Sequence, residues 1–137
     1  MPPELRAEVA AWLARSATDL LGAETLAAMP KPLGGLVCFL AQQSAEKQLK
    51  AFLVFRQTPF RKSHDLEYVL ELCVSLDQDF GALRTACKKL TPYAWEFRYP
   101  TLAADPSPEL VHEALELARE VARFVLSRLP AEFRQAR

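Results

Sequence analysis

The sequence predicts an all-α protein, folded as an antiparallel up-and-down bundle of four to five helices. Half of its 137 residues are hydrophobic, which is enough for a buried core in a single domain. The segments between Gly and Pro residues are rich in strong helix formers, and their apolar residues recur at steps of three and four. We expect one domain over residues 1–137, with its core in residues 4–129 and a frayed tail at 130–137.

A connector that contains two prolines separates the first two predicted helices. The apolar stripe of residues 3–21 predicts the first helix, and Gly22 is a plausible stop. Residues 23–33 form the connector. The second helix covers residues 34–56 and ends before Pro59, because proline disfavours helix in the residue that precedes it.

Three charged residues of the second helix, Glu46, Lys47 and Lys50, are expected on its outward face. Glu46 and Lys50 have the i, i+4 spacing of a surface ion pair, which stabilises a helix by only a few tenths of a kcal/mol. We interpret this face mainly as solvated. Lys47 stays a candidate binding residue if the fold brings it near the basic loop that follows.

Three more helices are predicted in the second half of the chain. The third begins at His64, with Ser63 as a candidate N-cap, and its apolar stripe reaches residue 76. The fourth covers residues 79–90. The last covers residues 108–129 and starts with the N-cap and first-turn proline of Ser107-Pro108.

Residues 93–100 contain four aromatic side chains, and their pattern allows two structures. The aromatic residues alternate, as in a strand, but they also form two i, i+4 pairs. We favour a helix that ends at Pro100, because a lone strand would have no partner. A nucleic-acid base could stack on Trp95, Phe97, Arg98 and Tyr99, but core or dimer packing is the favoured interpretation.

The overall charge and the cysteines exclude several classes of protein. Basic and acidic residues both number 17, so bulk electrostatic binding of nucleic acid is not expected. Cys38, Cys73 and Cys87 lie apart in apolar segments and indicate neither a disulfide framework nor a metal site. We expect no signal peptide, because the sequence starts with polar residues and an amphipathic helix, and we expect no membrane-spanning helix. We therefore expect a cytoplasmic protein that has no cofactor.

The loop before the third helix brings Arg61, Lys62, His64 and Asp65 together. A helix N-terminus exposes unpaired N–H groups and the positive end of a dipole, so two cations ahead of it favour an anion site. In that case His64 donates to a phosphate or exchanges a proton, and Asp65 orients it. The alternative is a capping histidine beside two solubilising cations.

The sequence contains no known motif for binding a metal ion or for nucleophilic catalysis. The two histidines, His64 and His112, do not have the spacing of a zinc-binding pair, and His112 belongs to a solvent-facing surface. The sequence has no GxSxG and no glycine-rich phosphate loop. Nucleophilic cysteine catalysis requires an exposed thiolate, whereas the three cysteines fall on or near apolar stripes.

Several segments together resemble the HEPN family of prokaryotic helical domains, over about residues 5–129. The residues that carry the resemblance are the AEKQLKA run at 45–51, the SHDL helix start at 63–66, the EFRYP break at 96–100, and the closing amphipathic helix. The resemblance implies a helical bundle that forms a homodimer. It also implies a minimal nucleotidyltransferase as partner, in pairs that often look like toxin–antitoxin modules.

The ribonucleases of this family carry an Arg followed by a His, with four to six residues between them, for phosphate orientation and proton transfer. This sequence departs from that pattern. Seven residues separate Arg56 from His64, two separate Arg61 from His64, and thirteen separate Arg98 from His112. The family's catalytic residues therefore have no counterpart here.

Our leading hypothesis from the sequence is a module that binds a nucleotide or a nucleotidyltransferase and has no catalytic activity. Its candidate binding residues are Arg61, Lys62, His64, Asp65, Arg98 and Lys47. The alternative is a metal-independent ribonuclease toxin of a toxin–antitoxin pair, in which His64 acts with Arg61 or Arg98.

Overall fold

The computed structural model describes residues 1–134. Within this range the chain forms five α-helices and three short 3₁₀ helices, and no strand, which confirms the predicted all-α class. The α-helices are α1 (Pro3–Ala27), α2 (Gly34–Phe55), α3 (Leu66–Leu76), α4 (Arg84–Leu90) and α5 (Pro108–Ser127). The 3₁₀ helices are η1 (Gln78–Leu83), η2 (Thr91–Ala94) and η3 (Ala131–Phe133). None of the helices in this range is long and apolar enough to cross a membrane.

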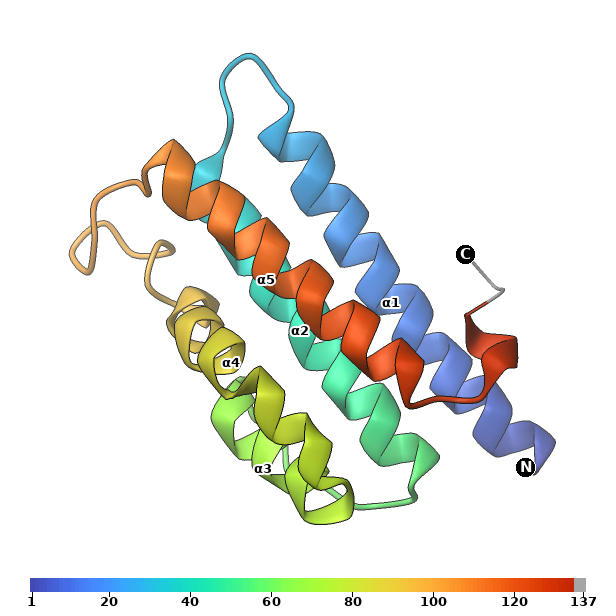
Figure 1. Cartoon of the computed structure of the whole chain (residues 1–137). Helices are drawn as coiled ribbons and strands as arrows, with labels where there is room; N and C mark the ends of the chain where they lie inside the picture. Colours follow the sequence, from blue (N-terminus) through green and yellow to red (C-terminus); the bar gives the residue numbers. More distant parts are fainter. Residues whose placement is uncertain (135–137) are drawn as a thin grey trace.

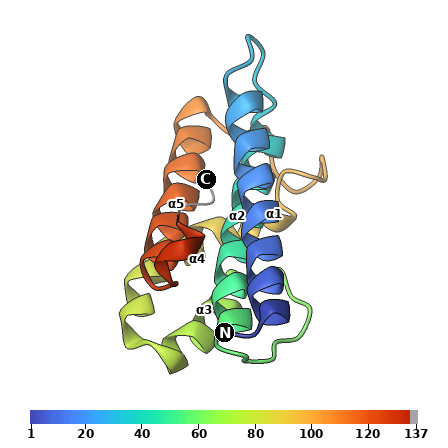
Figure 2. The same cartoon turned by 90° about the vertical axis from the view of Figure 1, so that its right-hand side faces the viewer.

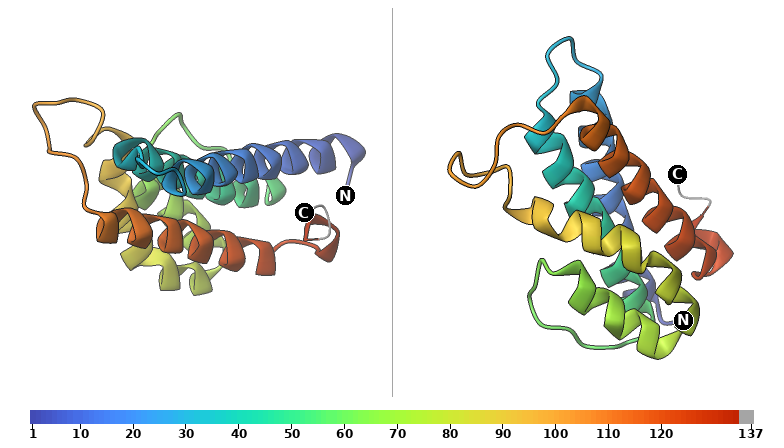
Figure 3. Two further views of the ribbon diagram at one scale, coloured as in Figure 1. Left: turned by 90° about the horizontal axis from the view of Figure 1, so that it is seen from above. Right: turned by 60° about the vertical axis from the view of Figure 1, so that its left-hand side comes forward.

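Helix α2 lies at the centre of the bundle and contacts α1, α3, α4 and α5. The three long helices α1, α2 and α5 run side by side, while α3 and α4 cover the second half of α2 (Figure 1). Seen from above, α1 and α2 form one layer and α5 lies in the next (Figure 3). A helix that is packed on several sides must be apolar or internally paired almost all round, which decides what the polar residues of α2 do.

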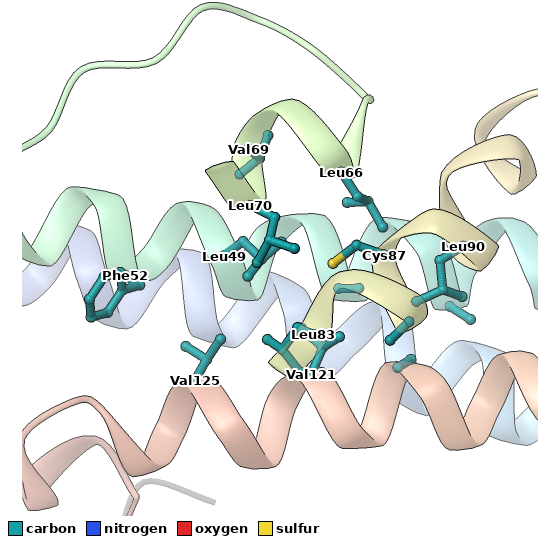
Figure 4. Packing of buried hydrophobic residues seen from close by; sticks show 14 of the residues in the cluster. Leu49, Phe52, Leu66, Val69, Leu70, Leu83, Cys87, Leu90, Val121 and Val125 are labelled. Atoms are coloured by element: carbon teal, nitrogen blue, oxygen red, sulfur yellow. The ribbon is translucent and has the colours of Figure 1, made fainter. Parts of the chain in front are cut away.

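Apolar side chains from all five α-helices meet in one core, part of which is drawn in Figure 4. The ring centroids of Phe52 and Phe80 are 4.4 Å apart, and those of Phe80 and Phe124 are 4.9 Å apart, so three phenylalanines join α2, η1 and α5. The labelled core side chains of Figure 4 are Leu49, Phe52, Leu66, Val69, Leu70, Leu83, Cys87, Leu90, Val121 and Val125.

Helix α1 is longer than the sequence predicts. It continues through Gly22 to Ala27, so Gly22 is not a stop and the connector is shorter than expected. Ala23 is fully buried and Leu26 packs against the core. Burial of these residues offsets the cost of one glycine in a helix interior, about 1 kcal/mol relative to alanine.

The start of α3 also differs from the prediction. Asp65, rather than Ser63, is the N-cap, and its carboxylate accepts the backbone N–H of Glu67 at 2.9 Å. The Ser63 hydroxyl instead accepts the N–H of Asp65 at 3.1 Å. His64 therefore lies in the loop just before the helix.

The helical extension favoured for residues 93–100 is wrong. The chain forms only η2 to Ala94 and then continues as turns, with Trp95 in a non-helical conformation. Phe97 packs so closely on α2 that a Cβ added to Gly35 would lie 2.9 Å from the Cβ of Phe97. The tertiary contact with this glycine accompanies the break in the helix. The predicted helix at 79–90 is likewise divided, into η1 and α4.

Residues 130–134 are packed against the bundle, in contrast to the predicted frayed tail. Phe133 is 5% exposed and belongs to the core. The Arg134 guanidinium donates to the carbonyls of Leu126 and Leu129 at 2.7 and 2.8 Å, which ties this segment to the end of α5. The rest of the predicted tail, residues 135–137, lies outside the described residues.

We predict that Phe133→Ala lowers the free energy of unfolding by about 3 kcal/mol, because it removes a buried aromatic side chain. Urea denaturation followed by circular dichroism measures the change. The control is Glu132→Ala, which removes only an exposed ion pair with Arg6 and is expected to change stability by less than about 0.5 kcal/mol. Equal stability of the two variants would show that this segment does not pack in solution.

Candidate binding site at the α2–α3 loop

The predicted basic corner lies on the loop between α2 and α3. Arg61, Lys62, His64 and Asp65 are all exposed there. Figure 2 shows this loop, in green, on the side of α1 and α2 that faces away from α5. The corner is therefore a surface feature, and what matters is how its side chains are held.

A buried carboxylate holds His64. The Nδ1 atom of its ring lies 2.9 Å from Oε1 of Glu46, whose side chain is only 5% exposed, whereas the His64 side chain is 66% exposed. With a proton on Nδ1, the ring donates to Glu46. The second nitrogen, Nε2, has no partner among the described residues and is then free to meet a ligand. The sequence suggested Asp65 for the orienting role, but Asp65 caps α3.

Glu46 belongs to a buried polar network on α2. Its Oε2 atom accepts from the Lys50 ammonium at 3.0 Å, and Lys50 also donates to the Ser63 carbonyl at 3.0 Å. The Gln42 amide donates to the His64 carbonyl at 2.9 Å and to Glu46 at 3.3 Å. Three side chains at four-residue steps, Gln42, Glu46 and Lys50, thus connect α2 to the backbone and ring of the loop.

The prediction that Glu46 and Lys50 lie on a solvated face is wrong. Both are buried, because the loop and two aromatic rings cover them. The Lys50 ammonium lies 5.5 Å from the ring centroid of Phe60 and 5.9 Å from that of Trp12. Sequence analysis missed Gln42 as part of the site. The signal in the sequence was the position of Gln42 four residues before Glu46, since residues four apart share one helix face.

Arg61 is held against an aromatic ring. Its guanidinium lies 3.7 Å from the ring centroid of Tyr68, and its backbone N–H donates to the Tyr68 hydroxyl at 3.1 Å. Stacking restricts the guanidinium without burying it, so its N–H groups still face solvent. Lys62 is exposed beside it.

The other two predicted residues, Arg98 and Lys47, lie apart from the corner. Lys47 forms an ion pair with Asp19 of α1. Arg98 stacks on Phe39 of α2, with its guanidinium 4.7 Å from the ring centroid. Phe39 and Glu46 are seven residues apart and so share one face of α2, roughly 10 Å apart along the helix. Arg98 therefore lies on the same side as the corner but about two turns away.

The three cysteines of the chain are buried thiols. Burial raises the pKa of Cys38 to about 11 and that of Cys87 to about 12, and it also raises the pKa of Cys73, so the three thiols are protonated near neutral pH. Within residues 1–134, no group of three or more His, Cys, Asp or Glu side chains is placed to hold a metal ion.

We predict that Glu46→Ala lowers the free energy of unfolding by about 3–5 kcal/mol, because it leaves the buried Lys50 ammonium without its carboxylate. The double variant Glu46→Leu with Lys50→Met should recover most of this loss but still release the loop. Chemical denaturation measures the first effect, and faster amide hydrogen exchange in residues 57–65 measures the second.

The control for this prediction is Glu113→Ala. It breaks an exposed ion pair with Lys89 and should change stability by less than about 1 kcal/mol. If loop exchange in the double variant stays at the unmutated rate, the network does not hold the loop.

Comparison with known proteins identifies the family. The family model of the HEPN domain matches residues 9–129 of the sequence. The fold is similar to the crystal structure of TT1696 from Thermus thermophilus, with 28% identity, a TM-score of 0.72, and coverage of 88% of this chain and 98% of that one. It is also similar to ST0689, an archaeal HEPN homologue, with 22% identity, a TM-score of 0.67, and coverage of 88% and 96%. No curated protein gave a significant match. The chain belongs to the HEPN family.

Proposed function

We propose that this HEPN-family module binds a nucleotide at the basic corner formed by Arg61, Lys62 and His64, acts with a minimal nucleotidyltransferase, and has no catalytic activity of its own. The observation that carries the proposal is the fixed orientation of His64 by the buried Glu46. Donors that are already held in place lose little side-chain entropy when an anion binds. Arg61, stacked on Tyr68, meets the same condition.

The side chains of the corner, rather than the start of α3, account for anion binding in this proposal. The Asp65 carboxylate already accepts an N–H of the first turn and places a negative charge there. A phosphate would be repelled from that position. It would instead meet the Arg61 guanidinium, the Lys62 ammonium and the exposed nitrogen of His64, which are charge-assisted donors when protonated.

A small ligand suits this corner better than a long nucleic acid. The chain has no net charge, and the loop concentrates only a few cations. In a cytoplasmic homodimer, which we propose as the working form, two copies of the corner could together offer a stronger anion site. Several exposed large apolar side chains are available for such a contact, among them Leu21, Trp95, Tyr99 and Leu102.

The Arg–His spacings of the sequence support a non-catalytic role. Arg61 lies too close to His64 in the chain for the ribonuclease pattern, and Arg98 stacks on Phe39 about two turns away. Lys47 is paired with Asp19, so we do not include it in the proposed site. Arg98 stays in the proposal only as a second contact for a ligand that extends along α2.

We expect ATP to bind the unmutated protein and to bind the variant Arg61→Ala with His64→Ala at least about tenfold more weakly, since two charge-assisted donors are lost. Isothermal titration calorimetry measures both affinities. Both residues are exposed, so the melting temperature should stay within a few degrees.

The matched control for ATP binding is Arg123→Ala, which removes an exposed cation of α5. Absence of ATP binding to the unmutated protein would reject the nucleotide part of the proposal. An equal loss in Arg123→Ala would show that binding depends on general charge and not on the corner. Recovery of a small nucleotidyltransferase in a pull-down from the native host would test the partner separately.

One observation favours ribonuclease activity as the second candidate function. A carboxylate that fixes one nitrogen of an imidazole leaves the other nitrogen oriented for proton transfer, which is how many general bases are arranged. The Glu46–His64 pair has this arrangement. In this alternative, His64 transfers the proton and Arg61 or Arg98 stabilises the phosphate. The histidine and the arginine face each other across a dimer interface.

The ribonuclease alternative predicts that purified protein cleaves RNA in the presence of EDTA and that His64→Ala abolishes cleavage. Glu46→Gln should reduce the rate by about a hundredfold, within the usual range for loss of an effective general base. Gel electrophoresis of the RNA measures the products. Intact RNA after long incubation with the unmutated protein would reject the alternative.

A further inference from the structure

A groove lies between the first half of α1 and the start of the α2–α3 loop. Its volume of about 490 Å³ is within the range of pockets that hold small molecules. Glu8 and Trp12 line it from α1, and Gln57 and Phe60 line it from the loop. Figure 2 shows the loop, in green, beside the first turns of α1. The groove borders the basic corner, since Phe60 directly precedes Arg61 in the chain.

Two aromatic side chains of this groove are held in place by each other and by the helix beneath them. The ring centroids of Trp12 and Phe60 are 6.0 Å apart, and the ring planes meet at 73°. The Lys50 ammonium lies within 6 Å of both centroids. The two side chains are half-buried, so each still presents part of its surface to the groove. Aromatic side chains of this kind stack on nucleic-acid bases, because every base has a π-face.

Two exposed polar side chains of the groove are available to a ligand. Neither the Glu8 carboxylate nor the Gln57 side-chain amide forms a hydrogen bond or an ion pair with another of the described residues. A carboxylate only accepts hydrogen bonds, whereas an amide both donates and accepts. This combination suits a base that carries an exocyclic amino group beside a ring nitrogen, as adenine does.

Gln57 occupies a backbone position that favours glycine. Its φ of 52° is the only positive φ of a non-glycine residue in the part of the chain that the structure describes. The N–H groups of Gln57 and Thr58 donate to the carbonyls of Val54 and Leu53, both at 2.9 Å, which is the Schellman arrangement at the end of a helix. Glycine adopts this conformation without strain. A glutamine in its place is a strained residue of the kind that gathers at ligand sites.

We propose that this groove binds the base of the nucleotide whose phosphates meet the basic corner, and that the base carries an exocyclic amino group. The inference rests on the proposed function. The lining contains the Glu8 carboxylate and no cation, so the phosphates are repelled from the groove and the orientation of the nucleotide is fixed. Val54 of the groove and Glu46 beneath the corner are eight residues apart on α2, about 12 Å, a distance that an extended nucleotide spans.

The test compares three ligands by isothermal titration calorimetry of the full chain. They are ATP, inorganic triphosphate, and purine riboside triphosphate, which is ATP without the amino group. ATP should bind at least about fivefold more tightly than inorganic triphosphate, the lower end of the gain from one stacked base. It should also bind about fivefold more tightly than purine riboside triphosphate, the effect of one hydrogen bond.

Two variants locate the base. Glu8→Ala should remove the preference for ATP over purine riboside triphosphate, and these two ligands carry the same charge, so a general change in electrostatics cancels. Gln57→Gly should reduce the preference for ATP over inorganic triphosphate by about fivefold. Its melting temperature should not fall, because glycine is the favoured residue at this backbone position, so misfolding cannot explain the loss. The matched control is Glu4→Ala, an exposed carboxylate of α1 outside the groove, which should leave both preferences unchanged.

The outcomes separate this inference from the proposed function. Equal affinity of the unmutated protein for ATP and inorganic triphosphate would overturn the inference and leave phosphate binding at the corner intact. Preferences that survive both Glu8→Ala and Gln57→Gly would place the base elsewhere and would also overturn it. Absence of binding by all three ligands would reject the proposed function, and this inference with it.

Discussion

The buried ion pair between Glu46 and Lys50 is the constraint that sets the geometry of the candidate site. Removing two charges from water costs several kcal/mol for each ion, and only close geometry with further hydrogen bonds offsets that cost. Here Glu46 also contacts Gln42 and His64, and Lys50 donates to the Ser63 carbonyl. Because two of these partners belong to the α2–α3 loop, the pair is fully satisfied only when the loop lies in one position.

Such a network contributes more to the position of the loop than to overall stability. Apolar side chains of similar volume often replace a buried ion pair without loss of stability. An apolar face at residues 42, 46 and 50 would cover the same area of α2 but would accept many loop conformations. The polar network selects the conformation in which His64 meets Glu46, and the same conformation places Arg61 over Tyr68. The buried polar network of α2 thus determines how the side chains of the basic corner are positioned.

Much of the fold was predictable from the sequence, because helical periodicity and cap residues are local signals. The start of α5 at Pro108, with Ser107 as its cap, follows directly from such a signal. The errors occur where tertiary contacts override local preference. Burial of Ala23 favours the continuation of α1 beyond Gly22. The packing of Phe97 on Gly35 accompanies the break in the helix after η2. Burial of Phe133 fixes a segment that its sequence predicts to be frayed.

The candidate site was less predictable, since only part of it is contiguous in the chain. Arg61, Lys62 and His64 are neighbours in sequence and stay neighbours in space. The residue that orients His64 is eighteen positions away, and its charge favoured an outward position on α2. A charged i, i+4 pair usually lies on a solvated face, and nothing local shows that a loop will cover it. The two aromatic rings near Lys50, those of Trp12 and Phe60, become informative only when the fold brings them together.

The central position of α2 explains why its polar residues fall into two groups. One side carries Gln42, Glu46 and Lys50, which the α2–α3 loop satisfies. The side towards α1 carries Ser44 and Gln48, and Ser44 is satisfied because the hydroxyls of Ser44 and Ser16 each donate to the other residue's backbone carbonyl. Gln48 has a longer side chain, and the residues opposite it on α1 are mostly alanines, which offer neither a side-chain partner nor the bulk to fill the space. The small residues that line this side of α1 thus leave Oε1 of Gln48 without a hydrogen-bond partner, whereas the longer polar side chains on the other side of α2 find theirs in the loop.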